Sequence, residues 1–88
     1  MQYILSKRFE KDFAKLPPAT KKKAILTLEK FVENPQNPTL RNHGLLGNWK
    51  GHFSISVTGD VRAIYFVRVE DMVRFVAIGS HSELYGYS

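Results

Sequence analysis

The sequence predicts an α+β fold in which an N-terminal helical hairpin packs on a small antiparallel β-sheet. Two observations lead to this prediction. Apolar residues recur at helical spacing in the first half of the 88-residue chain, and they alternate with polar residues in the second half. A chain of this length buries only about 60 to 65% of the surface that its unfolded form exposes, which is enough for one core. We therefore expect residues 1–88 to form a single domain.

The chain opens with a short strand candidate, Tyr3 to Leu5, followed by Ser6, whose hydroxyl can cap a helix by accepting a backbone N–H bond. Apolar residues then recur every three or four positions from Phe9, which predicts a short amphipathic helix over Lys7 to Leu16. Two prolines end this helix, and the second, Pro18, suits the first turn of the next helix.

The second helix is predicted to hold a single apolar stripe against the sheet. The stripe consists of Ala24, Ile25, Leu28, Phe31 and Val32. Asn34 and two nearby prolines, Pro35 and Pro38, are expected to stop the helix.

Strands are predicted throughout the second half. The alternation of residues 52–57 is typical of a half-buried strand, and residues 58–60 form a turn. Val61 to Val67 is apolar on nearly both faces, which predicts a central strand. A turn at Glu70 and Asp71 leads to another strand, Val73 to Ile78, and a further strand within Leu40 to Leu46 is expected to pair with the one after residue 51.

Composition limits the class of protein. No cysteine is present, so disulfide and thiolate chemistry are excluded. No apolar run is long enough for a signal peptide or a membrane span, so we expect a cytoplasmic protein without a membrane partner. The net charge of +5 lies in the first half, where nine basic residues face four acidic ones, whereas residues 45–88 hold four of each. This excess is either a solvated helix face or a field that attracts nucleic acid or an acidic protein.

Arg62 is unusual because it interrupts an apolar strand, where an unpaired charge is costly to bury. It is expected either to pair with a carboxylate such as Asp60 or to face a functional surface. His43, His52 and His81 are the only histidines, and their spacing does not suit a metal site, so no metal or other cofactor is expected. Imidazole, carboxylate and guanidinium groups together suit RNA cleavage without a metal, because they can transfer protons and stabilise a phosphorane.

Three motifs in the second half carry a resemblance to a known family. These are L-x-G-x-W-x-G at residues 45–51, G-D-x-R-x-I-Y at 59–65 and I-G-x-H-x-x-L-Y at 78–85. In this order and spacing the chain resembles the RelE/ParE superfamily of bacterial toxins, most closely its YafQ-like branch of mRNA endonucleases. The resemblance implies a RelE-like microbial ribonuclease fold over the whole chain.

The resemblance also implies an active site made of His43, Asp60, His81 and Tyr85, with Arg62 at the place where many members contact the scissile phosphate. His81 is expected to be the general acid, and His43 or Asp60 the base or the group that orients it. Tyr85 is expected to contact the substrate, or else to cover the core at the C-terminus.

Three further positions near these motifs carry their own expectations. We expect Lys50 to be a secondary substrate contact and Trp49 to be a packing residue. The family pattern often has a second histidine at the position of Ser56. His52, the nearest candidate to replace it, is four residues away, about 13 Å along a strand.

The function that follows is that of a type II toxin: a metal-independent endoribonuclease that cuts mRNA in association with the ribosome and so inhibits translation. The resemblance implies a cognate antitoxin whose acidic segment wraps over the basic face. Two alternatives stay open, namely a ParE-like non-enzymatic toxin that binds DNA gyrase and an inactive binding module.

Overall fold

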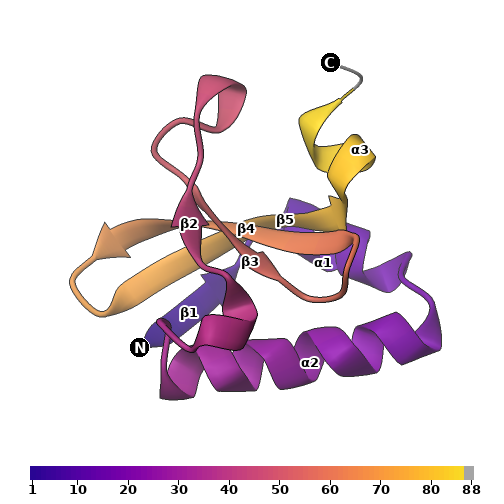
Figure 1. Cartoon of the computed structure of the whole chain (residues 1–88), viewed down its shortest axis with the longest axis horizontal. Coiled ribbons are helices and arrows are strands. Elements are labelled where there is room, and N and C mark those ends of the chain that lie inside the picture. The colour runs from indigo at the N-terminus through magenta and orange to yellow at the C-terminus, as the bar shows by residue number, and fades with distance from the viewer. Residues whose placement is uncertain (87–88) are drawn as a thin grey trace.

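The computed structural model describes residues 1–86, and no helix in this range is long and apolar enough to span a membrane. Five strands, three α-helices and two 3₁₀ turns follow one another along the chain (Figure 1). In order they are β1 (Gln2–Leu5), α1 (Lys7–Ala14), α2 (Pro18–Glu33), η1 (Pro38–Leu40), β2 (His43–Gly44), η2 (Gly47–Trp49), β3 (Phe53–Ser56), β4 (Val61–Val69), β5 (Met72–Ser80) and α3 (His81–Tyr85).

The strands form one sheet in the order β1-β5-β4-β3-β2, so the prediction of β4 as a central strand is confirmed. The pairs β2–β3, β3–β4 and β4–β5 are antiparallel, as expected for strands that follow one another with short connections. The prediction of a wholly antiparallel sheet is wrong, because β1 pairs with β5 in parallel. These two strands lie at opposite ends of the chain, so no hairpin turn dictates their relative direction.

Both predicted helices pack on one face of the sheet, and α2 runs along this face (Figure 1). α2 begins at Pro18, as predicted, whereas α1 ends two residues before Leu16. The predicted apolar stripe of α2 is only partly right: Ile25 is 50% exposed and Val32 41% exposed. Thr27 is buried instead, and its hydroxyl donates to the carbonyl of Lys23, which makes its burial tolerable.

Phe75 of β5 lies at the centre of this core and is fully buried. Its ring has four aromatic neighbours with centroids 5.2–5.8 Å away. They come from β1, α1, α2 and β4, and they are Tyr3, Phe9, Phe31 and Tyr65. One side chain therefore joins both helices to three strands.

The opposite face of the sheet is covered by α3 and by the loop between β2 and β3 (Figure 1). Leu84 of α3 packs on Ile64 and Ala77, and Trp49 of the loop lies against this cluster. Because both faces are covered here, Ser54 is completely buried and β3 is not the half-buried strand that its alternation predicted.

A β-bulge in β5 determines which residues face α3. Ile64 is paired with Ala77 and Tyr65 with Phe75, so Val76 is an extra residue in β5. Val76 and Ala77 consequently both contact the α3 side, whereas Ile78 returns to the core beneath α1 and α2.

Beyond the end of β1, backbone groups at the edge of β5 form hydrogen bonds with side chains at the start of α1 and within it. The Ser6 hydroxyl accepts from the amide of Phe9, as the predicted helix cap should, and it also donates to the carbonyl of Val76 at 3.1 Å. The Asp12 carboxylate accepts from the amide of Ile78 at 3.2 Å. α1 thus replaces strand partners that β1 is too short to provide.

Replacing Phe75 by Ala is expected to lower the free energy of unfolding by about 3–5 kcal/mol, because it leaves a cavity where five elements meet. Urea denaturation checks this. Val69→Ala is the control, since Val69 is 64% exposed and should change the stability by less than about 0.5 kcal/mol. Equal effects of the two substitutions would contradict the central position of Phe75.

Candidate active site

Arg62 lies opposite Ser56 of β3 and Gly79 of β5. Paired residues of an antiparallel sheet point to the same side, so all three belong to the face that carries α3. The Arg62 Nη1 donates to the carbonyls of Thr58 at 2.9 Å and Val61 at 3.3 Å. Within residues 1–86 no carboxylate lies within 4.0 Å of this guanidinium, so the predicted alternative of an ion pair with Asp60 is not formed.

His81 and Asp60 are neighbours through the backbone. β4 and β5 are paired as far as Val61 and Ser80, and the amide of His81 then donates to the carbonyl of Asp60 at 3.1 Å. Asp60 itself is exposed in the turn before β4, where the Thr58 hydroxyl accepts from its amide. Two predicted site residues that are 21 positions apart are thus held side by side.

A capping box holds the start of α3, where His81 is the first residue. The Ser80 hydroxyl accepts from the amide of Glu83, and the Glu83 carboxylate accepts from the amide of Ser80 at 2.8 Å. The hydrogen bond from the Ser80 amide to the carboxylate, with a smaller contribution from the Ser80 side chain, lowers the pKa of Glu83 below its ordinary value. A Cβ at Gly79 would lie 3.0 Å from a Glu83 carboxylate oxygen, so a larger residue there would require the Glu83 side chain to shift by a few tenths of an ångström.

Tyr85 is one helical turn beyond His81, and the two ring centroids are 4.5 Å apart. Tyr85 also contacts the cluster of Ile64, Ala77 and Leu84. The geometry is therefore compatible with both predicted roles, since the same ring covers the core and lies against the imidazole.

His43 occupies the edge strand β2, opposite Ser54, and so points to the same face as Arg62. It is two strands away from Arg62, about 10 Å across the sheet, and it is displaced from Arg62 by two residues, about 7 Å, along the strands. Its Nδ1 lies 2.8 Å from the carbonyl oxygen of Arg41. A carbonyl can only accept, so Nδ1 carries the proton, and in the neutral ring Nε2 keeps a free lone pair.

The segment before His43 is tied to the core. The Tyr65 hydroxyl donates to the Asn42 side-chain carbonyl at 2.8 Å, and the Asn42 amide group donates to the carbonyl of Pro35 at 3.0 Å. Burial raises the pKa of Tyr65 above its ordinary value. A neutral Tyr65 can therefore donate this bond well above neutral pH.

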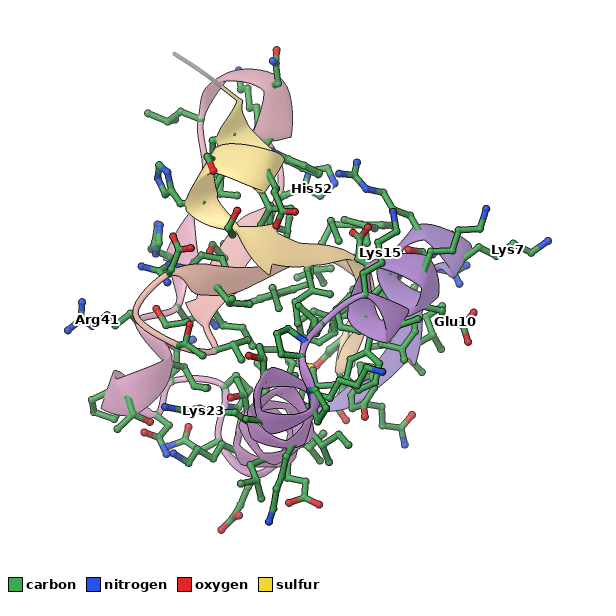
Figure 2. The ribbon with its side chains drawn as sticks, turned by 90° about the vertical axis from the view of Figure 1, so that its right-hand side faces the viewer. Lys7, Glu10, Lys15, Lys23, Arg41 and His52 are labelled. Carbon is green, nitrogen blue, oxygen red and sulfur yellow. The ribbon has the colours of Figure 1, made fainter. Side chains whose placement is uncertain are left out.

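His52 does not replace the histidine that the family pattern has at the position of Ser56. Its ring lies edge-on between Trp49 and Phe66, with centroid distances of 5.3 and 5.5 Å. In Figure 2 it lies on the far side of α3 from Arg41. Within residues 1–86 no three His, Asp or Glu side chains are grouped as metal ligands would be.

Trp49 is a packing residue, as predicted. Its indole N–H donates to the carbonyl of Leu84 at 2.8 Å, which fastens the β2–β3 loop to α3. Positive φ angles at Gly47 and Gly51, 66° and 88°, allow the tight loop that brings the indole there. Lys50, in the same loop, is exposed.

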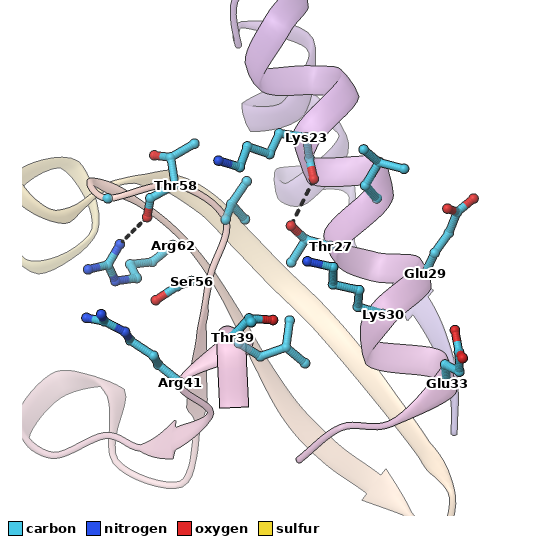
Figure 3. A pocket seen from close by; sticks show the side chains of 14 residues that line it. Lys23, Thr27, Glu29, Lys30, Glu33, Thr39, Arg41, Ser56, Thr58 and Arg62 are labelled. Carbon is cyan, nitrogen blue, oxygen red and sulfur yellow. Dashed lines mark hydrogen bonds between the residues drawn. The ribbon is translucent and has the colours of Figure 1, made fainter. Parts of the chain in front are cut away.

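A groove beside Arg62 contains residues that the sequence analysis did not single out. It has a volume of ≈ 550 Å³ and lies between α2 on one side and η1, β3 and the β3–β4 turn on the other (Figure 3). Its cations besides Arg62 are Lys23, Lys30 and Arg41. In the sequence, only the excess of positive charge in the first half pointed to these residues, because residue spacing cannot predict that α2 lies beside Arg62 of β4.

The fold is that of small bacterial toxins. The chain is 25% identical to YafQ from E. coli strain BL21(DE3), with a TM-score of 0.81 and coverage of 97% of this chain and 98% of that one. It is 32% identical to HP0894, a conserved hypothetical protein from Helicobacter pylori, with a TM-score of 0.74 and coverage of 96% and 98%. A crystal structure of the E. coli DinJ–YafQ complex matches at 27% identity and a TM-score of 0.70, covering 97% of this chain and 98% of that one.

The family model for the bacterial toxin of type II toxin–antitoxin systems, YafQ, matches residues 1–86. The chain therefore belongs to the YafQ toxin family, and it is a toxin of a type II toxin–antitoxin system. No curated protein sequence matches it.

Replacing Ser80 by Ala is expected to loosen α3, because it removes the hydroxyl of the capping box at a cost of about 1 kcal/mol. The amide of Gly86 donates to the backbone carbonyl of Ser82 at the end of α3, and it should then exchange its hydrogen about 5-fold faster. Exchange in β4 and β5 should not change. Ser82→Ala, which leaves both hydrogen bonds of the box in place and loses only a 3.4 Å contact with the Ser80 hydroxyl, is the control. Unchanged exchange at Gly86 in Ser80→Ala would show that the box does not hold α3.

Proposed function

We propose that this toxin is a metal-independent endoribonuclease that cuts mRNA on the ribosome and thereby inhibits translation. The observation that carries the proposal is the placement of Arg62 on the same sheet face as His43, beside the strand end from which α3 presents His81 and Tyr85. These groups can supply a base, an acid and a cation around one phosphate.

His43 is the general base in this mechanism. The Arg41 carbonyl keeps the proton of the neutral ring on Nδ1, which leaves Nε2 free to remove the proton of a ribose 2′-hydroxyl. The 2′-oxygen then attacks the adjacent phosphorus. Asp60 lacks such an orienting contact of its carboxylate within residues 1–86, and we assign it instead to positioning His81.

Arg62 stabilises the phosphorane, and His81 completes the reaction. Among residues 1–86 the guanidinium has no partners beyond the two carbonyls that Nη1 contacts, so its other N–H groups can bind the negative phosphate oxygens. His81 gives a proton to the departing 5′-oxygen as the P–O bond breaks. The products are a 2′,3′-cyclic phosphate and a 5′-hydroxyl end.

Tyr85 and Lys50 contact the substrate in this proposal. The Tyr85 ring beside His81 can stack on the base next to the cut, as aromatic side chains do with single-stranded RNA. Lys50, exposed in the β2–β3 loop, can reach a phosphate there.

The cognate antitoxin is proposed to cover the basic surface of this cytoplasmic toxin with an acidic segment. The crystal structure of the E. coli DinJ–YafQ complex supports a protein partner of this kind, and the net charge of +5 suits an acidic one.

Replacing His81 by Ala is expected to slow cleavage of a translated mRNA by at least about 100-fold, because a general acid contributes that order of rate. Primer extension, with and without ribosomes, maps and quantifies the cuts of the native and variant chains. Circular dichroism of both chains checks that they are folded. His52→Ala is the matched histidine control and should keep its activity within a few-fold, since His52 packs away from the site.

If His81→Ala cuts the mRNA as fast as the native chain does, His81 is not the general acid. If the native chain cuts no RNA under either condition, the ribonuclease proposal fails, and binding to DNA gyrase becomes the assay to perform.

The tautomer of His43 is a second test that does not need activity. In the neutral ring, ¹⁵N NMR should show a protonated Nδ1 and an unprotonated Nε2, because the Arg41 carbonyl can only accept. The opposite tautomer would exclude Nε2 as the base and transfer that role to Asp60. His52, whose Nδ1 lies 3.4 Å from the carbonyl of Lys50, provides a comparison with a weaker contact.

A further inference from the structure

The groove between α2 and the β3–β4 turn has a consistent electrostatic character. Four of its lining residues are cations, and within residues 1–86 none of them has a carboxylate within 4.0 Å. Figure 3 shows Lys23 and Lys30 directed from α2 toward the β-strand side, whereas Glu29 and Glu33 point away on the outer side of the helix. The inner wall of the groove is therefore positive and the carboxylates lie at its rim.

Arg41 and Arg62 form the end of the groove nearest the candidate active site. Their side chains extend in the same direction with Ser56 between them (Figure 3). The small side chain of Ser56 leaves this space open. Two guanidinium groups arranged in this way can hold phosphate oxygens from two sides.

The remaining polar lining also suits phosphates. Thr58 accepts through its hydroxyl oxygen from the amides of Asp60 and Val61, which leaves its hydroxyl proton available as a donor. Ser56 makes no side-chain hydrogen bond within residues 1–86. Hydroxyl, lysine and arginine donors are the groups that contact nucleic-acid backbones. An acidic peptide would need apolar anchors, and Leu26, half exposed, is the one large apolar side chain that α2 offers here.

Arg41 connects the groove to the chemistry. Its φ of 50° turns the chain sharply after η1, so that the carbonyl accepts from His43 while the side chain lines the groove. The residue that orients the proposed base is therefore also a wall of the groove.

We propose that this groove is a binding track for the RNA strand next to the cut. Arg62 contacts the scissile phosphate, Arg41 the neighbouring phosphate, and Lys23 and Lys30 the phosphates beyond it. The inference rests on the proposed ribonuclease function, and it adds a direction for the substrate: one flank of the RNA leaves the sheet face around the edge of β3 and runs along α2.

The test measures binding of a single-stranded RNA oligonucleotide, 2′-O-methylated throughout so that it cannot be cut, to the native full chain. Fluorescence anisotropy gives Kd as a function of salt. We compare Arg41→Asn, which keeps a residue that tolerates the positive φ, with the double variant Lys23→Gln and Lys30→Gln. The control is Lys7→Gln with Lys11→Gln, a double variant of equal charge on α1, and Figure 2 shows Lys7 on the opposite side of the molecule from Arg41.

The groove variants are expected to bind more weakly, and the slope of log K against log salt should fall by about 0.7 for each phosphate contact removed. The control should keep the native slope. Equal slopes for groove and control variants, with the native chain binding RNA, would overturn the track while leaving the ribonuclease proposal intact. Absence of RNA binding by every chain would overturn the track, whereas the ribonuclease proposal would still be decided by the cleavage assay with ribosomes. Loss of polyglutamate binding in the groove variants, with RNA binding unchanged, would make the groove a peptide site instead.

Discussion

The pairing of β4 with β5, including the bulge at Val76, is the interaction on which the rest of the structure depends. β4 is central and apolar on both faces, so each face has to be covered. The bulge shifts the alternation of β5, which places Ile78 under α1 and α2 and Gly79 beside Arg62 on the other face. The chain then leaves β5 on the side where α3 can pack on Ile64. The position of His81 next to Asp60 follows from this shift and from the backbone bond that ends the hairpin.

Core and site share residues, so their stabilities are coupled. Tyr65 belongs to the aromatic core around Phe75, yet its hydroxyl reaches Asn42 and so holds the segment that carries Arg41 and His43. On the other face, Trp49 fastens the β2–β3 loop to Leu84 of α3. Disturbance of either contact would move a proposed catalytic group without changing its chemistry. In a domain of 88 residues there is little surface that serves the site alone.

The replacement of the family's second histidine by Ser56 has a structural counterpart. Ser56 lies directly opposite Arg62, where a larger side chain would extend into the groove entrance. His52 packs against Trp49 and Phe66, so its imidazole does not lie beside Arg62. The proposed chemistry therefore uses two histidines, His43 and His81, with the guanidinium of Arg62 between their elements, and the open space beside Ser56 is used for binding.

Local sequence patterns determined the helices α1 and α2, the three hairpin strands β3 to β5, the central place of β4 and the cap at Ser6, because each of these depends on residues close together in the chain. The three motifs also led to the family, and the resemblance to it led to His43, Asp60, Arg62, His81 and Tyr85 as candidate site residues. Only the tertiary structure decided that β1 runs parallel to β5, that Ile25 and Val32 stay exposed, that Ser54 is buried, and that Arg41, Lys23 and Lys30 share a groove with Arg62. These features depend on how distant segments pack, and neither a period of two nor one of 3.6 contains that information.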